Sequence, residues 1–140
     1  MKKYMNLALL YAILAMVGGV FYREFTKFNG FSGRTALGLV HTHYFILGMV
    51  FFLLLVLLEK SFSFTGAKTP RPLLIYNIGL NLTLVMLLVR GVTQVLACQL
   101  SKAMDAAISG IAGLGHLLLA IGLVMLLLQV KQAVLATQKD

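Results

Sequence analysis

Long apolar stretches alternate with short polar connections along this 140-residue chain. A helix that crosses a lipid bilayer needs roughly 20 mostly apolar residues. Lipid offers the backbone no hydrogen-bonding partners, and the stretches are too few for a β-barrel, so each one must be helical. The pattern therefore predicts an all-α fold, an integral membrane four-helix bundle that forms a single domain over residues 1–140. The four helices are expected at residues 5–22, 36–58, 73–97 and 107–130.

The connections between these stretches carry turn-forming residues. Proline breaks a regular helix after its first turn, so the third span cannot begin much before Pro72. The connection 99–106 is short, and the third and fourth spans are therefore expected to be antiparallel neighbours. Ser101 or Asp105 is expected to cap the fourth span. The first connection carries aromatic residues suited to a membrane interface, namely Phe25, Phe28 and Phe31.

Composition and charge agree with a membrane location. The chain is 60% hydrophobic and 11% charged, whereas soluble domains are about 45–50% apolar and about 25% charged. The net charge of +8 does not indicate nucleic-acid binding, because the basic residues stand singly between apolar runs. Lys2 and Lys3 precede an apolar run, as in a secretory signal, but this run ends in Phe21 and Tyr22 rather than at small residues. We therefore expect an uncleaved first span that contacts the lipid bilayer.

The distribution of Lys and Arg predicts the orientation of the bundle, because basic residues favour the cytoplasmic side. They are more numerous on the side of the N-terminus, so both termini are expected in the cytoplasm of a bacterial cell, with the chain in the inner membrane. The N-terminal side holds Lys2, Lys3, Lys60, Lys68, Arg71, Lys131 and Lys139, and the opposite side holds Arg23, Lys27, Arg34 and Lys102.

Polar side chains inside the expected spans are the candidates for chemistry, because burying them in lipid is costly. No acidic residue lies deep in a span, which disfavours a proton-coupled transporter. The amides Asn77, Asn81 and Gln94 are expected to hydrogen-bond between helices. The complete set is His41, His43, Asn77, Asn81, Arg90, Gln94 and His116.

Three histidines and one arginine of this set fall in a single layer. At 1.5 Å per residue, His41 and His43 lie roughly 8–10 Å from the end of the bundle where the second span begins. Arg90 lies about 10 Å and His116 roughly 13 Å from the same end. Haem iron binds neutral imidazole, and a nearby arginine can hold the propionates. The layer therefore predicts haem b, with Arg90 and, at the mouth of the second span, Arg34 beside the propionates.

Helical geometry separates the first two histidines. Each residue turns the helix by about 100°, so the rings of His41 and His43 point about 200° apart and cannot ligate one metal from a regular helix. Either one is a ligand and the other structural, or each serves a different slot. Gly38 and Gly48 lie on the face of His41, where glycine lets a flat ring or a neighbouring helix approach the backbone.

Residues 41–49, His-Thr-His-Tyr-Phe-Ile-Leu-Gly-Met, resemble a signature of the catalytic subunit of haem–copper oxidases. In that family the two histidines of a His-x-His-Tyr run ligate two haems on opposite sides of one helix. The resemblance implies that His41 holds an oxygen-reactive haem and His43 an electron-transfer haem, with Tyr44 in the same motif. The family's copper site needs histidines on other helices, where this chain has only His116. We therefore expect neither copper nor oxygen reduction coupled to proton pumping.

The same resemblance implies an assembly. The oxidase subunit has twelve helices in three arcs of four, so a four-helix chain corresponds to one arc and a homotrimer is implied. His41 of one copy and His43 of the next would then ligate one haem. In the alternative, a single chain holds the haem between the second and fourth spans, with His116 opposite His41 or His43. Over its whole length the chain resembles a family of small four-helix bacterial membrane proteins of unknown function.

Three functions remain open from the sequence. The first is a membrane b-type cytochrome, which either exchanges electrons with a redox partner or binds or senses a diatomic gas. The second is a structural or assembly subunit of a larger membrane complex, in which the histidines only hydrogen-bond between helices. The third is a small transporter, which the even helix count favours.

Overall fold

The computed structural model describes residues 1–138, and this part of the chain is helical apart from short connections. Lys139, one of the charges that predict the orientation, lies outside the described residues. A continuous rod from Leu37 to Phe62 forms the second span, and four helices in all are long and apolar enough to cross a membrane. The elements are α1 (Lys2–Phe28), α2 (Leu37–His43), η1 (Tyr44–Val50), α3 (Phe51–Phe62), α4 (Pro70–Val95) and α5 (Lys102–Thr137).

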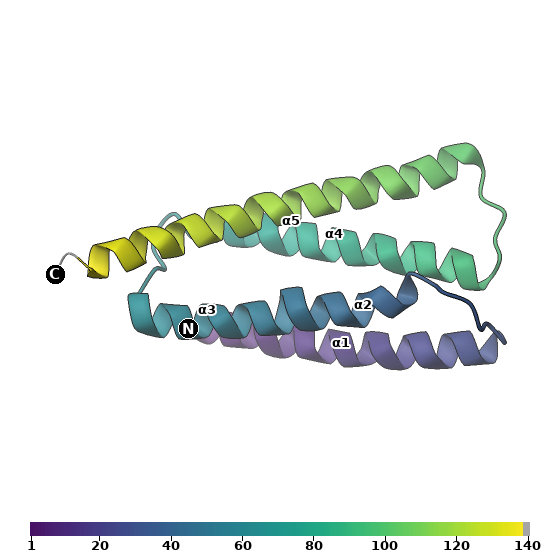
Figure 1. Cartoon of the computed structure of the whole chain (residues 1–140), viewed down its shortest axis with the longest axis horizontal. Coiled ribbons are helices and arrows are strands. Elements are labelled where there is room, and N and C mark those ends of the chain that lie inside the picture. The colour runs from purple at the N-terminus through teal and green to yellow at the C-terminus, as the bar shows by residue number, and fades with distance from the viewer. Residues whose placement is uncertain (139–140) are drawn as a thin grey trace.

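Two antiparallel helical hairpins lie side by side (Figure 1). The N-terminal hairpin consists of α1 and the second span, and the C-terminal hairpin consists of α4 and α5. The N-terminus and the last turn of α5 lie at one end of the bundle, here called the terminal end. The connections α1–α2 and α4–α5 lie at the other, here called the Cys98 end. The all-α four-helix prediction is confirmed, and the chain is a multi-pass membrane protein.

The helices are longer than the apolar stretches that predicted them. The first continues to Phe28, so Phe25 and Phe28 belong to a helix rather than to a loop. The third begins at Pro70, because a proline in the first turn needs no backbone N–H. The fourth begins at Lys102, and the hydroxyl of Ser101 accepts a hydrogen bond from the Met104 N–H at 3.2 Å. Polar residues thus continue each helix beyond the apolar segment, where hydropathy gives no signal.

Glycines let the backbones of the two helices in the C-terminal hairpin come into direct contact. A Cβ atom added at Gly79 would lie 2.2 Å from the Leu119 nitrogen, and one at Gly122 would lie 2.5 Å from the Tyr76 nitrogen. A Cβ at Gly115 would meet the backbone and hydroxyl of a threonine of α4 at 2.7 to 2.8 Å. Small residues allow this close packing of helices in lipid. The short connection thus joins antiparallel neighbours, as predicted.

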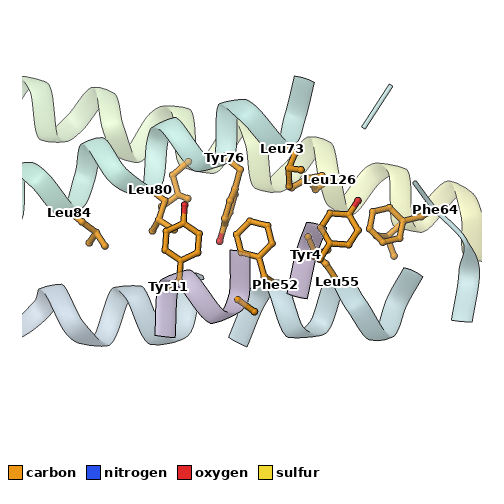
Figure 2. Close-up of a cluster of buried hydrophobic side chains, with 13 residues drawn as sticks. Tyr4, Tyr11, Phe52, Leu55, Phe64, Leu73, Tyr76, Leu80, Leu84 and Leu126 are labelled. Atoms are coloured by element: carbon orange, nitrogen blue, oxygen red, sulfur yellow. The ribbon is translucent and has the colours of Figure 1, made fainter. Parts of the chain in front are cut away.

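Aromatic side chains fill the space between the two hairpins (Figure 2). The ring of Tyr76 reaches from α4 toward the N-terminal hairpin and packs edge-on against Phe52, with ring centroids 5.9 Å apart. Tyr11 of α1 stacks on the other side of this cluster, 5.6 Å from Phe52. On α1 the buried positions recur at intervals of four and three residues, at Tyr4, Ala8, Tyr11 and Ala15.

The second span is not a regular α-helix along its whole length. Its middle segment, η1, is π-helical, and the Phe51 N–H bonds to the carbonyl of Ile46, five residues earlier. A Cβ added at Gly48 would lie only 2.5 Å from the Cβ of Tyr11, so α1 crosses close to this segment. The π-helical segment begins directly after His43. Hydrophobic periodicity gave no indication of it, because nearly every residue here is apolar.

Candidate functional site

His41 packs into the interface between α2 and α1. A Cβ added at Gly19 would lie 3.7 Å from the Cβ of His41, and the His41 ring stacks on Tyr22 with centroids 6.4 Å apart. Its Nδ1 atom is buried and has no hydrogen-bond partner. The glycines of α1 therefore make room for this histidine, and its ring fills the interface between the two helices.

The two glycines on the face of His41 are also covered by α1. A Cβ at Gly38 would lie 3.5 Å from the ring of Tyr22, and one at Gly48 would collide with Tyr11. Of the two occupants expected there, a flat ring or a neighbouring helix, the structure places the neighbouring helix.

His43 lies on another side of α2, in an open groove of about 300 Å³ that it lines with Thr42, Ile46 and Leu47. Its Nδ1 atom lies 2.8 Å from the carbonyl oxygen of Leu39. A carbonyl can only accept, so this nitrogen carries the proton and donates it. In the neutral imidazole the Nε2 atom then keeps its lone pair, and this is the form of histidine that binds metals.

His116 has the same tautomer on a different helix. Its Nδ1 atom lies 2.8 Å from the carbonyl of Ala112, so Nε2 again keeps a lone pair. The side chain is exposed on α5, and three residues earlier Gly113 has no neighbouring atom within 4 Å of the position a Cβ would take. α5 packs along α4 and, less extensively, against α3, whereas α2 packs against α1 and α4. Within residues 1–138 no three His, Cys, Asp or Glu side chains gather as a metal site.

His43 and His116 lie at similar depths in the bundle. Gly91 of α4 touches Leu37 of α2, and Thr83 of α4 touches Gly115 of α5. Thr83 precedes Gly91 by eight residues, about 12 Å along the helix. His43 follows Leu37 by six residues, about 9 Å along the helix. His116 directly follows Gly115, so it lies about 13 Å from the level of Leu37. Both free Nε2 atoms therefore belong to one layer near the Cys98 end.

The two arginines predicted beside haem propionates lie in different surroundings. Arg90 forms an ion pair with Asp105 and donates to the hydroxyl of Ser109 at 2.6 Å, so it links α4 to α5. Arg34 is exposed in the α1–α2 connection and lines a cavity of about 490 Å³ together with Tyr22, Gly38, Leu39 and Gln94. Arg90 thus has an acidic partner within the chain, while Arg34 borders open space.

A polar network crosses the middle of the bundle. The Tyr11 hydroxyl donates to Asn77 Oδ1 at 2.5 Å and accepts from Asn81 Nδ2 at 2.9 Å. The Tyr44 hydroxyl donates to Asn81 Oδ1 at 3.2 Å. The network thus joins α1, η1 and α4, and both asparagines hydrogen-bond between helices as predicted. Tyr44, assigned to the histidine motif by resemblance, belongs to this network.

A family model described as "Protein of unknown function (DUF2871)" matches residues 1–133. The chain belongs to this family. No curated protein and no solved structure matches it. The DUF2871 match covers all three histidines and agrees with the expected kinship to a family of unknown function, but it assigns no activity.

Sequence reasoning on this DUF2871 chain overlooked two tyrosines. Tyr11 organises the polar network, and the Tyr76 hydroxyl donates to the Leu47 carbonyl at 2.6 Å. The set of polar candidates inside the spans leaves these tyrosines out, although a buried hydroxyl needs a partner. The signal was the regular spacing of Tyr4, Ala8, Tyr11 and Ala15, which marks one packed face of α1.

Proposed function

We propose that this protein binds haem b as a b-type cytochrome-like membrane protein, with the iron held between copies of the chain. The observation that carries the proposal is His43. Its Nδ1 proton is donated to a backbone carbonyl 2.8 Å away, and its ring lines an open groove. Haem requires a neutral imidazole that presents Nε2 in an apolar setting, and this side chain meets that requirement.

We assign the second axial ligand to another copy, in which His116 fits that role. It has the same tautomer, it is exposed, and it lies at a depth similar to that of His43. Copies related by an axis perpendicular to the membrane keep their depths, so His43 of one copy can face His116 of the next. The open space at Gly113 would let a flat ring approach α5. A homotrimer, implied by the resemblance to one arc of the oxidase subunit, has such an axis.

The pairing of His41 with His43 of the next copy, also implied by the resemblance, is less well supported. His41 packs against Gly19 and Tyr22 of its own chain, and its buried Nδ1 has no acceptor. An axial histidine normally donates that proton to a carbonyl or carboxylate. We therefore assign His41 to helix packing and His43 with His116 to the iron.

When bound, haem would supply one-electron redox chemistry. Two histidine ligands close the iron to other molecules, and this arrangement favours electron transfer with a redox partner over gas binding. The protein's own contribution is to hold the two rings at similar depths and to keep water away by placing them within the apolar span. Arg34 is the cation with open space beside it for the propionates.

Visible spectra of the purified protein, oxidised and reduced, test this proposal. Sharp reduced bands are expected in the wild type, and they should be lost in His43→Ala and in His116→Ala. The matched control is His41→Ala, which should keep the bands. A colourless wild type from haem-supplied cells would reject the haem proposal. Loss of the bands only in His41→Ala and His43→Ala would restore the oxidase-like pairing.

A second candidate function is that of a structural or assembly subunit. The supporting observation is the face of α5 at Gly110 and Gly113, where, among residues 1–138, no atom beyond the neighbouring turns of α5 lies within 4 Å of either Cβ position. Small residues of this kind allow another helix to dock closely. This function predicts that all three histidines can be replaced by alanine while the protein still co-purifies with its complex.

We further propose a location in the bacterial inner membrane with both termini in the cytoplasm. The support is the excess of basic residues on the N-terminal side. Cys98, the single cysteine of the sequence, is exposed at the α4–α5 connection. A membrane-impermeant maleimide added to intact spheroplasts should therefore label it. Labelling only after the membrane is opened would reverse the orientation.

A further inference from the structure

The π-helical segment η1 directly follows the histidine pair, and its geometry sets the direction in which both rings point. A π-helix bonds each N–H five residues back rather than four, so one turn accommodates one additional residue. If η1 became a regular α-helix while α3 stayed in place, the residues before it would turn by about 100°. Thr42 would then take the place of His41 against α1.

Tyr76 of α4 contacts this segment at two points. Its hydroxyl donates to the Leu47 carbonyl at 2.6 Å, within η1. Its ring stacks on Phe51, the residue directly after η1, with centroids 4.4 Å apart. Figure 2 shows the Tyr76 ring pointing from α4 toward Phe52 of the second span.

The backbone of Tyr76 is itself fixed. It lies against Gly122 of α5, where an added Cβ would come within 2.5 Å of the Tyr76 nitrogen. The C-terminal hairpin therefore holds the tyrosine in place, and the tyrosine contacts the irregular part of the second span.

We infer that Tyr76 is a positioning residue for the histidine pair: it holds the π-helical turn of η1 and so fixes which residue of α2 faces α1. Its importance for haem ligation rests on the proposed function, whereas the rotation itself does not. π-helical turns occur frequently at functional sites, and here the turn lies one residue from His43.

Disulfide crosslinking tests the rotation without haem. In a Cys98→Ser background, Gly19→Cys is combined with His41→Cys or with Thr42→Cys. The Cβ atoms of positions 19 and 41 lie 3.7 Å apart, within the roughly 3.5–4.5 Å that a disulfide needs. We expect efficient crosslinking to position 41 and little to position 42. Tyr76→Phe, which removes only the hydroxyl, should reverse this preference.

The matched control is Tyr4→Phe. It removes a hydroxyl that lies 2.8 Å from Thr65 at the terminal end, and crosslinking should stay at position 41. A preference for position 41 that is unchanged by Tyr76→Phe would overturn the inference.

Deletion of Ile46 keeps the test decisive if Tyr76→Phe fails to fold. Ile46 is 61% exposed, and its deletion removes the additional residue of η1. The shortened span should be α-helical, with position 41 against α1 whether Tyr or Phe stands at position 76. If the preferred crosslink in this deletion variant moved from position 41 to position 42, the inference would also be overturned. A protein without haem would reject the proposed function and leave these crosslinking results unaffected.

Discussion

The two hairpins of this protein are held together in different ways. In the C-terminal hairpin, α4 and α5 approach until the backbone at Gly79 touches that of Leu119. In the N-terminal hairpin, α1 and the second span meet through side chains, His41 against Tyr22 and Tyr11 over Gly48, and the second span contains a π-helical segment. In the C-terminal hairpin, the backbone contact leaves no space for α4 and α5 to move closer together. The packing of the N-terminal hairpin depends on ring stacking and hydrogen bonds, which a small rotation can exchange.

This difference suggests how the parts cooperate. The C-terminal hairpin provides a fixed surface, and Tyr76 and Asn81 project from it toward the N-terminal hairpin. The N-terminal hairpin carries two of the three histidines, so its exact rotation decides what they face. A rigid element thus orients an adjustable one that carries candidate ligands.

The largest expected effect comes from filling a glycine contact of the C-terminal hairpin. Gly79→Ala would place a methyl group 2.2 Å from a backbone nitrogen of α5, so α4 and α5 must separate. Overpacking of this kind costs on the order of 1–3 kcal/mol or more of unfolding free energy. Thermal unfolding in detergent should show a clear fall in Tm.

Gly113→Ala is the matched control for that substitution, because no atom lies within 4 Å of its Cβ position. Alanine is the better helix former by about 1 kcal/mol, so Tm should stay unchanged or rise. An equal fall in Tm for Gly79→Ala and Gly113→Ala would mean that close helix packing at Gly79 does not contribute more to stability than the open position at Gly113.

A smaller effect is expected between the hairpins. Asn81→Leu removes hydrogen bonds to Tyr11 and Tyr44 while it keeps the volume. Hydrogen bonds between membrane helices are worth about 0.6 kcal/mol on average and up to about 2, so a loss of about 1–2 kcal/mol is expected. A double-mutant cycle with Tyr11→Phe should show positive coupling. Additive losses would show that the network does not act as a unit.

The smallest effect is expected at the Arg90–Asp105 ion pair. Its side chains are 26% and 55% exposed, and exposed ion pairs contribute roughly 0–1 kcal/mol. Arg90→Gln and Asp105→Asn should therefore change Tm little, and less still at high salt. The pair also tests the sequence prediction for Arg90. If Arg90 held a haem propionate, only Arg90→Gln would shift the reduction potential of the haem.

The fold was predictable because its signal is redundant. Each span exceeds the length that lipid requires, so single polar residues such as Asn77 did not obscure it. The short connection after Val95 settled the pairing of α4 with α5. Helix ends were less predictable, because Lys102 and Pro70 continue a helix without contributing hydropathy.

The candidate site was predictable only as a layer. The depth of His43 and His116 follows from counting residues along helices whose ends were roughly known. Which neighbour each ring faces depends on helix rotation, and a uniformly apolar segment carries no periodic signal for it. The π-helical turn after His43 changes that rotation by one residue. The structure is therefore needed to tell whether side chains from different helices face the same binding site.

The polar contacts along α5 also carry information on membrane thickness. Ser109 bonds to Arg90 near one end of the helix, and Gln129 bonds to the Lys68 carbonyl near the other, at 3.2 Å. At 1.5 Å per residue these contacts are roughly 30 Å apart, which matches the hydrocarbon thickness of an ordinary bilayer. The two contacts therefore mark where the apolar belt ends. In a much thicker bilayer they would be drawn into the acyl chains, so the protein should favour membranes whose thickness matches this span.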